Sequence, residues 1–225
     1  MPTDRTVTIG DGKDYENLQL FDDAEAIDIT AAGSDENIIA ECYGAVGGHN
    51  LAFPTGVVTM ISGWTTDATH QVYVRAAAGH EAPVSGVFDE EKAYCEFTNP
   101  VTGSFNFNLG LDITFDGIQF KFAITTTNSR PVFATGKSVS FDSCLMIVTF
   151  DPLFLGTVEA GFVKHNAPDR SCTYKNNTFI MHMANNTASV AGCYTQGLGA
   201  GIEHFFYNNT IILEGGVSGA KSVLQ

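Results

Sequence analysis

The stretch YKNNTFIM at residues 174–181 returns as FYNNTIIL at residues 206–213. In both copies an Asn-Asn-Thr triplet separates an aromatic residue from a run of apolar residues, and the second copy begins 32 residues after the first. Two earlier runs join the series, at steps of 26, 33 and 32 residues, when one aromatic column is aligned: Phe115, Phe141, Tyr174 and Phe206. A recurring period of this size is typical of repeat architectures, in which each unit buries its core against the next one.

Further columns of similar residues accompany the aromatic column. Two residues before it stand Ile113, Val139, Cys172 and His204. Five residues after it stand Phe120, Met146, Phe179 and Ile211, and seven residues after it stand Phe122, Val148, Met181 and Leu213. Between them, two residues after the aromatic residue, stand the small and turn-forming residues Gly117, Ser143, Asn176 and Asn208. This pattern predicts two strands in each unit, joined at a sharp corner.

A second register indicates that each unit holds about three strands. Val132, Phe162 and Cys193 align at steps of 30 and 31 residues, ahead of the aromatic strand. Most of the remaining chain also consists of short runs rich in Val, Ile, Phe and Thr, separated by turn-forming residues. One helix is expected near the start, within residues 11–27, with Asp14 as its N-cap.

These repeated columns resemble the right-handed parallel β-helix of the pectin-lyase-like family. The resemblance covers residues 10–225 and is strongest over residues 105–225. It implies an all-β fold, a right-handed single-stranded parallel β-helix of about five to six rungs with a short N-terminal capping helix. The chain would form one domain, residues 1–225, with residues 1–30 as the cap. Asparagine side chains stack from rung to rung at the corner of such folds, so Asn176 and Asn208 are expected to form a buried structural ladder.

The N-terminal part and the composition suggest where such a chain would act. IGDGKDYENLQLFDDAEAIDIT, residues 9–30, is similar to the cap and first rungs of β-helix proteins of tailed bacteriophages. The 225 residues include 11 basic and 25 acidic ones, and this net charge of −14 opposes binding to nucleic acid and to anionic membranes. The N-terminus resembles no signal peptide, and no run approaches the length of a membrane span, so synthesis in the host cytoplasm is expected.

Residues able to bind a ligand lie on the outward face of the aromatic strand. Alternation directs Asp112, Thr114 and Asp116 outward, and Ser138, Ser140 and Asp142 in the next unit. Asp116 and Asp142 would lie about 4.8 Å apart, close to the carboxylate separation of retaining glycosidases. The same pair would also suit a calcium ion, and the alternative is that both carboxylates simply point into solvent. Phe205 and Tyr207 offer a surface for stacking on sugar rings, with Lys175 beside them.

No cofactor is predicted from this sequence. The 5 cysteines include no C-x-x-C pair, and the 6 histidines show no spacing typical of a metal cluster. We therefore interpret the cysteines as small core residues.

Three classes of function are compatible with the sequence. The one we favour is a structural virion protein of a tailed bacteriophage, a capsid decoration, fibre or tail-spike component that contacts other virion proteins and host-surface glycans. The second is a polysaccharide-degrading enzyme, a glycosidase or lyase with Asp116 and Asp142 as catalytic residues. A polyuronate lyase is disfavoured, because none of the four arginines lies on the outward face of an aligned strand. The third is a non-catalytic carbohydrate-binding module with Phe205 and Tyr207 as its stacking surface.

The last residues carry one further expectation. SVLQ, at residues 222–225, falls where the strand of the next unit should begin, one 31-residue step after Cys193. An uncapped end of a repeat stack exposes unpaired backbone and apolar core. Either a longer chain or another subunit, most simply in a homotrimer, is expected to cover this end.

Overall fold

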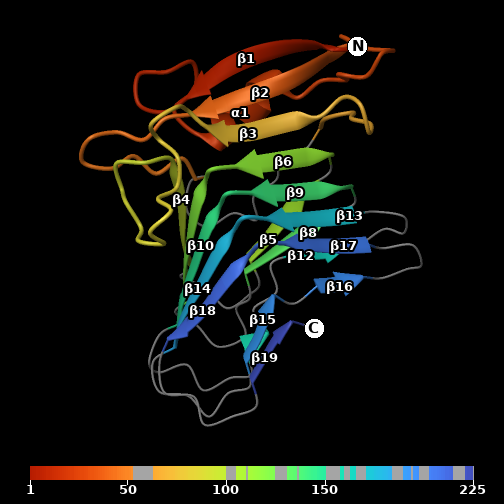
Figure 1. Cartoon of the computed structure of the whole chain (residues 1–225). Helices are drawn as coiled ribbons and strands as arrows, with labels where there is room; N and C mark the ends of the chain where they lie inside the picture. The colour runs from red at the N-terminus through yellow and green to blue at the C-terminus, as the bar shows by residue number, and fades with distance from the viewer. Residues whose placement is uncertain are drawn as a thin grey trace.

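The computed structural model describes residues 1–52, 63–99, 105–109, 111–124, 131–135, 137–150, 158–159, 163–165, 171–183, 190–193, 195–197, 203–214 and 221–224. In this part of the chain the fold is mostly β, with parallel sheets and one helix, α1 (Leu18–Glu25). Strands from successive units lie side by side in the sheets (Figure 1).

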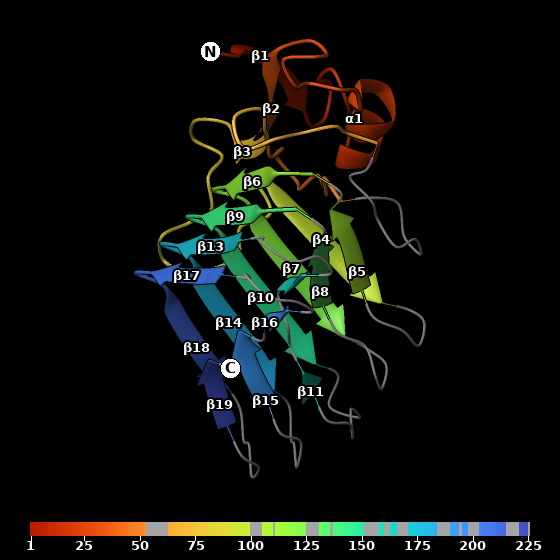
Figure 2. The same ribbon diagram turned by 90° about the vertical axis from the view of Figure 1, so that its right-hand side faces the viewer.

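The largest sheet has seven strands in the order β1 (Thr3–Ile9), β2 (Glu36–Cys42), β3 (Val72–Ala76), β6 (Ile113–Asp116), β9 (Val139–Asp142), β13 (Ser171–Lys175) and β17 (Glu203–Tyr207). A five-stranded sheet contains β4 (Tyr94–Asn99), β7 (Gln119–Ile124), β10 (Leu145–Phe150), β14 (Thr178–Met183) and β18 (Thr210–Glu214). Figure 2 shows the strands of both sheets stacked in the same direction. Each step along the stack advances by one unit of the sequence repeat.

Two smaller sheets complete the described strands. One contains β5 (Phe105–Leu109), β8 (Pro131–Thr135), β12 (Val163–His165) and β16 (Thr195–Gly197). The other contains β11 (Val158–Glu159), β15 (Val190–Cys193) and β19 (Lys221–Leu224). The pairings in all four sheets are parallel, which requires a crossover between each strand and its neighbour.

The aromatic column is confirmed by the strand register. Phe115 pairs with Phe141, Phe141 with Tyr174, and Tyr174 with Phe206. The successive rings are stacked, with centroids 5.3, 5.7 and 4.7 Å apart and interplanar angles of 13°, 9° and 8°. The same column continues through Val7, Ala40 and Val74 in the first three strands of the sheet. Small residues therefore begin the column and aromatic residues continue it.

The corner between the first and second strands of each unit is also confirmed. Gly117, Ser143, Asn176 and Asn208 have φ values of 67°, 55°, 56° and 52°. This left-handed region suits glycine and is tolerated by asparagine, whereas serine adopts it at a cost. Backbone pairing continues around the bend, because the amide of Asn176 donates to the carbonyl oxygen of Tyr207 at 3.0 Å.

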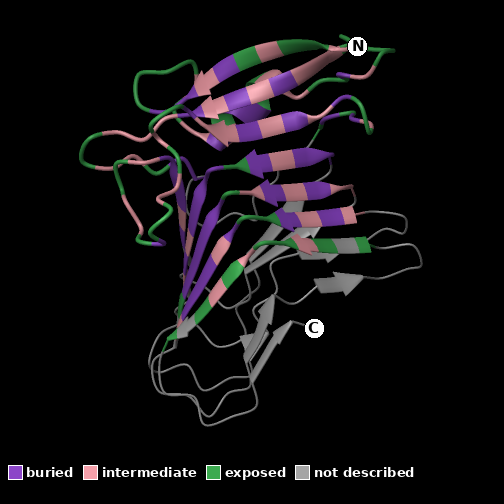
Figure 3. Cartoon of the chain, in the orientation of Figure 1, coloured by how far each residue is buried: buried purple, intermediate pink, exposed green. Residues whose placement is uncertain are grey.

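A continuous apolar core lies between the sheets and runs the length of the described stack. Buried residues alternate with more exposed ones along the strands of the seven-stranded sheet (Figure 3). A second, smaller core lies on the outer side of the five-stranded sheet, where Ala82 and Phe88 cover Leu145, Ile147 and Ile180. The outer side of the seven-stranded sheet carries mostly polar side chains instead, and it is therefore the candidate ligand-binding face.

Two expectations from the sequence are wrong in detail. The helix begins at Leu18, and its N-cap is Asn17, whose side-chain oxygen accepts hydrogen bonds from the amides of Gln19 and Leu20. Asp14 instead accepts hydrogen bonds from Thr8, both from its amide and from its hydroxyl.

The second register is correct only for part of its length. The partner of Phe133 is Val163, which is the expected 30-residue step, although Phe162 itself lies outside the described residues. Val163 then pairs with Thr195, so Cys193 does not share this sheet. It belongs to β15 and pairs with Leu224, because the chain forms two short strands, β15 and β16, in place of one.

Candidate functional site

The outer face of the seven-stranded sheet carries two parallel columns of outward residues. One column is Thr6, Ile39, Tyr73, Thr114, Ser140, Thr173 and Phe205. The other is Thr8, Glu41, Arg75, Asp116, Asp142, Lys175 and Tyr207. Neighbours within a column are about 4.8 Å apart along the sheet. The predicted residues Asp116, Asp142, Lys175 and Tyr207 therefore occupy consecutive positions of one column.

Two ion pairs form among the charged residues of this column. Arg75 donates from Nη2 to Glu41 Oε1 at 3.1 Å, and Lys175 donates from Nζ to Asp142 Oδ2 at 2.7 Å. Asp116 stands between these pairs, and within the described part of the chain no hydrogen bond or ion pair reaches its carboxylate. One of the three acids in the column is thus left without a cation of its own.

The neighbouring carboxyl groups of Asp116 and Asp142 have opposite tendencies. Partial burial, together with the negative charge of Asp142, raises the pKa of Asp116. Burial also acts to raise the pKa of Asp142, but hydrogen bonds from Lys175, Ser143 and Asn176 outweigh it and lower that pKa. Paired carboxyl groups with separated pKa values can divide the roles of acid and base between them.

A hollow of about 350 Å³ lies beside Asp116 on this face. The strands β1, β2, β3, β6 and β9 contribute to its lining. The lining includes Asn37, Tyr73, Arg75, Thr114, Asp116 and Asp142. Arg75 and Tyr73 were missed in the sequence reasoning, which placed no arginine on an aligned outward face. The alternation in HQVYVRA, where Val72 and Val74 are buried, carried the signal. The argument against a polyuronate lyase from missing arginines is therefore wrong.

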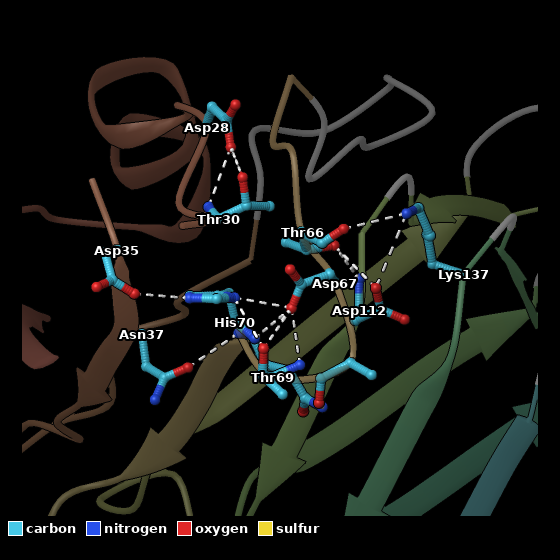
Figure 4. Close-up of polar contacts among 12 residues, drawn as sticks. Asp28, Thr30, Asp35, Asn37, Thr66, Asp67, Thr69, His70, Asp112 and Lys137 are labelled. Atoms are coloured by element: carbon cyan, nitrogen blue, oxygen red, sulfur yellow. Dashed lines mark hydrogen bonds and ion pairs between the residues drawn. The ribbon is translucent and has the colours of Figure 1, made fainter. Parts of the chain in front are cut away.

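A second hollow, of about 500 Å³, lies at the other end of the same strands, near their first residues. Its lining includes the segment Thr66–Ala68 and the hydroxyl side chains of Ser138, Ser140 and Ser171. Figure 4 shows the polar contacts that build one wall of it, around Thr66, Asp112 and Lys137.

Asp112 lies at this second hollow but does not point freely outward as predicted. Its residue surface is only 6% exposed, and its carboxylate accepts hydrogen bonds from the Thr66 hydroxyl at 3.0 Å and the Ser138 amide at 3.0 Å. The reason is that Asp112 precedes the first residue of β6, so the alternation of the strand does not reach it. Asp112 therefore stabilises the backbone just before β6 and β9 begin.

His70 stabilises the edge of the second hollow through hydrogen bonds. Its ring is hydrogen bonded to Asp67 through Nδ1 at 2.8 Å and to Asp35 through Nε2 at 3.0 Å (Figure 4). These two hydrogen bonds, the one to Asp35 foremost, raise the pKa of His70. These hydrogen bonds connect the segment that contains Asp67 to Asp35, the residue before β2.

The aromatic residues predicted to stack on sugars lie next to each other on β17. Phe205 is 37% exposed and Tyr207 is 52% exposed. Their ring centroids are 6.3 Å apart and their planes differ by only 6°, so the two rings lie parallel to each other. Lys175 is the register partner of Tyr207, but its ammonium group is engaged by Asp142. The structure thus places Lys175 near the aromatic pair with its charge already neutralised.

The predicted asparagine pair forms at the corner, but on the surface. The Asn208 amide donates to Asn176 Oδ1 at 3.1 Å, and Asn176 donates to Asp142 Oδ1 at 3.1 Å. Both side chains are exposed, because a left-handed residue at the corner turns its side chain outward. The buried amide is the next residue, Asn177, which is 1% exposed and donates to Asn209 Oδ1 and to the carbonyl oxygen of Phe141.

The described residues contain no group of three or more His, Cys, Asp or Glu side chains arranged to hold a metal ion. Their single helix, of 8 residues, is too short to cross a membrane. Comparisons with protein-family models, with curated proteins and with solved structures find no match to this chain.

Proposed function

We propose that this chain is a right-handed parallel β-helix, a virion protein of a tailed bacteriophage whose outer face binds a glycan of the host surface. The observation that carries the binding proposal is the exposed pair of parallel rings formed by Phe205 and Tyr207 at one end of a polar sheet face. Aromatic faces in contact with solvent are a common surface for stacking on flat ligands.

The strand order supports a helical coil of the backbone. From β6 onward, each unit passes through the seven-stranded sheet, turns at a two-residue corner and continues in the five-stranded sheet, as β6 does with β7 and β9 with β10. The pairings among the described strands join equivalent strands of neighbouring units, which supports a solenoid. A coil of this kind would present the outward columns as a straight, rigid surface.

The rest of the face supports a ligand rich in hydroxyl groups. The two hollows are lined by serine, threonine and asparagine side chains next to charged groups. Such side chains supply both donors and acceptors, as sugar hydroxyls require. Because the hollows and the aromatic pair share one sheet face, an extended glycan would contact both.

The phage particle as the setting is supported by the N-terminal similarity and by the acidic composition. An antibody against this chain should then label purified particles of the phage that encodes it, and mass spectrometry of those particles should recover its peptides. Particles that lack the chain would remove the virion assignment without affecting the binding proposal.

Replacing Phe205 and Tyr207 together by alanine tests the binding proposal. Glycan-array binding by the wild-type chain should be lost or reduced about tenfold or more in the double variant, because aromatic stacking contributes on the order of 1 kcal/mol per ring. Ile212→Ala is a matched control, since Ile212 is as exposed as Phe205, at 37%, but lies on the five-stranded sheet. Equal binding by the double variant and the control would refute the role of the rings.

A second candidate is glycoside hydrolysis with Asp116 as acid and Asp142 as base or nucleophile. The observation in its favour is the opposite direction of their pKa changes. In that case Asp116→Asn and Asp142→Asn would each abolish the release of reducing sugars from a bound glycan. We expect no release by the wild-type chain, because the Asp142 carboxylate is engaged by Lys175. Reproducible release that both variants lose would make the enzyme the better proposal.

A further inference from the structure

The smaller hollow differs from the rest of the face in the balance of its charges. Glu41 is neutralised by Arg75, and Tyr43 also donates to it at 2.8 Å. Asp142 is neutralised by Lys175, with further hydrogen bonds from Ser143 and Asn176. Asp116, between the two pairs, forms no ion pair and accepts no hydrogen bond among the described residues, and the charges of Lys175 and Arg75 act on it only from a longer distance.

The geometry around Asp116 leaves room for a donor from outside the chain. Asp116 lines the hollow of about 350 Å³ together with two neutral side chains of the neighbouring column, Tyr73 and Thr114. Its neighbours within its own column are Arg75 and Asp142. The nearest cation along the column, Arg75, directs its Nη2 to Glu41 on the far side. Asp4, at another edge of the hollow, already accepts a hydrogen bond from Asn37 at 3.0 Å.

We infer that the smaller hollow selects a glycan that carries a free amino group, and that Asp116 is the residue that binds the ammonium. This inference depends on the proposed glycan binding and adds its chemical class. An ammonium beside Asp116 would relieve the repulsion between the Asp116 and Asp142 carboxylates. A uronic acid would add a third negative charge to the same place, and an acetylated amine would bring no charge.

A calcium ion fits this place less well than an ammonium group does. Calcium takes six to eight oxygen ligands, whereas one of the two carboxylates here is already bound by Lys175 at 2.7 Å. An amino group needs only one carboxylate and the neutral acceptors around it, such as the Tyr73 and Thr114 hydroxyls.

Isothermal titration of three oligosaccharides of equal length separates these classes. The probes are a chitosan oligomer with free amines, its fully acetylated counterpart and an oligogalacturonate with carboxylates. We expect the amine to bind roughly three- to fivefold more tightly than the acetylated probe, as for one partly screened ion pair, and the advantage to shrink at high salt. The carboxylate probe should bind most weakly.

Two variants at the hollow and one control make the result specific. Asp116→Asn should bind the amine and the acetylated probe equally, and Thr114→Lys, which supplies an ammonium from the chain, should do the same. Glu91→Gln removes one charge from the segment that packs over the other sheet and should keep the preference. Thermal melting verifies that each variant is folded.

The outcomes distinguish this inference from the proposed function. Binding of the acetylated probe as tight as that of the amine, or a preference that survives Asp116→Asn, overturns the inference and leaves glycan binding in place. If none of the three probes binds and an array of other glycans also fails, both proposals are wrong. The tightest binding by the carboxylate probe would contradict the charge argument directly.

Discussion

Replacing Asn177 by alanine should destabilise the fold far more than replacing its exposed neighbour Asn176 by glycine. The Asn177 side chain is 1% exposed, and its amide group donates to the carbonyl oxygen of Phe141 at 3.0 Å and to Asn209 Oδ1 at 3.1 Å. Its oxygen accepts a hydrogen bond from the amide of Cys144 at 2.9 Å. One side chain therefore satisfies two backbone groups of the unit before it and also contacts a side chain of the unit after it.

The magnitude follows from the groups that the substitution leaves behind. Alanine would strand the Phe141 carbonyl and the Cys144 amide in a buried place, at roughly 1–3 kcal/mol for each unpaired group. The expected loss is therefore about 3 kcal/mol in the free energy of unfolding, which lowers the melting temperature by about 6–12 °C for a chain of this size.

The assay is urea unfolding followed by circular dichroism, with Asn176→Gly as the control. Glycine keeps the left-handed φ of 56° at residue 176 and removes only an exposed side chain. Its effect should stay below about 1 kcal/mol, since exposed hydrogen bonds are replaced by water. An Asn177→Ala variant as stable as the wild type, or a control equally damaged, would refute the assignment of the buried amide.

Two further changes test other parts of the fold. Gly117→Ala should cost about 1–2 kcal/mol, because residue 117 has a φ of 67° and a Cβ there would lie 3.3 Å from the Cβ of Ala76; an unfolding midpoint equal to that of the wild type would contradict the strained corner. His70→Gln should reduce stability more at pH 5.5 than at pH 8.5. The pKa of His70 is raised in the folded chain by Asp35 and Asp67, so its contribution is complete below the ordinary value of about 6.5 and is lost as the pH rises through the folded value. Melting curves that show the same difference at both pH values would contradict this.

The part of the fold that was predictable from the sequence is the part with large or conspicuous repeated residues. Aromatic residues and the Asn-Asn-Thr triplet identified the units from Phe115 onward, and the strand register confirms them. The first three strands have Val7, Ala40 and Val74 in the same column, and no repeated triplet follows them. Small apolar residues are common in every strand, so their recurrence does not reveal the repeat period of the sequence.

The candidate site was predictable only where alternation within a strand decides the direction of a side chain. Asp116 and Asp142 lie inside β6 and β9 and are register partners as expected. Asp112 lies one residue outside its strand and is buried against Thr66 instead. The ion pair between Lys175 and Asp142 also could not be read from the sequence. Register predicts that two residues are neighbours, but the rotamers of long side chains decide which groups meet.

The two asparagines of the repeated triplet have different structural roles. At the first corner position the requirement is a left-handed backbone, and glycine, serine and asparagine all occur there, as in Gly117, Ser143 and Asn176. At the second position the Asn177 and Asn209 side chains turn inward toward the carbonyl oxygen of the aromatic residue in the unit before, whereas the Ile118 side chain in the first aligned unit has no donor.

The donors at this second position change along the stack while their target stays the same. Asn209 donates to the carbonyl of Tyr174 at 2.9 Å, and Asn177 donates to that of Phe141. In the unit before, the Cys144 thiol takes the same place, 3.6 Å from the carbonyl of Phe115. A thiol is a weak donor, whereas an amide can donate to the backbone and to the next side chain at once. The repeat of Asn-Asn is therefore set by its second residue, because that residue connects neighbouring units through hydrogen bonds at the edge of the core.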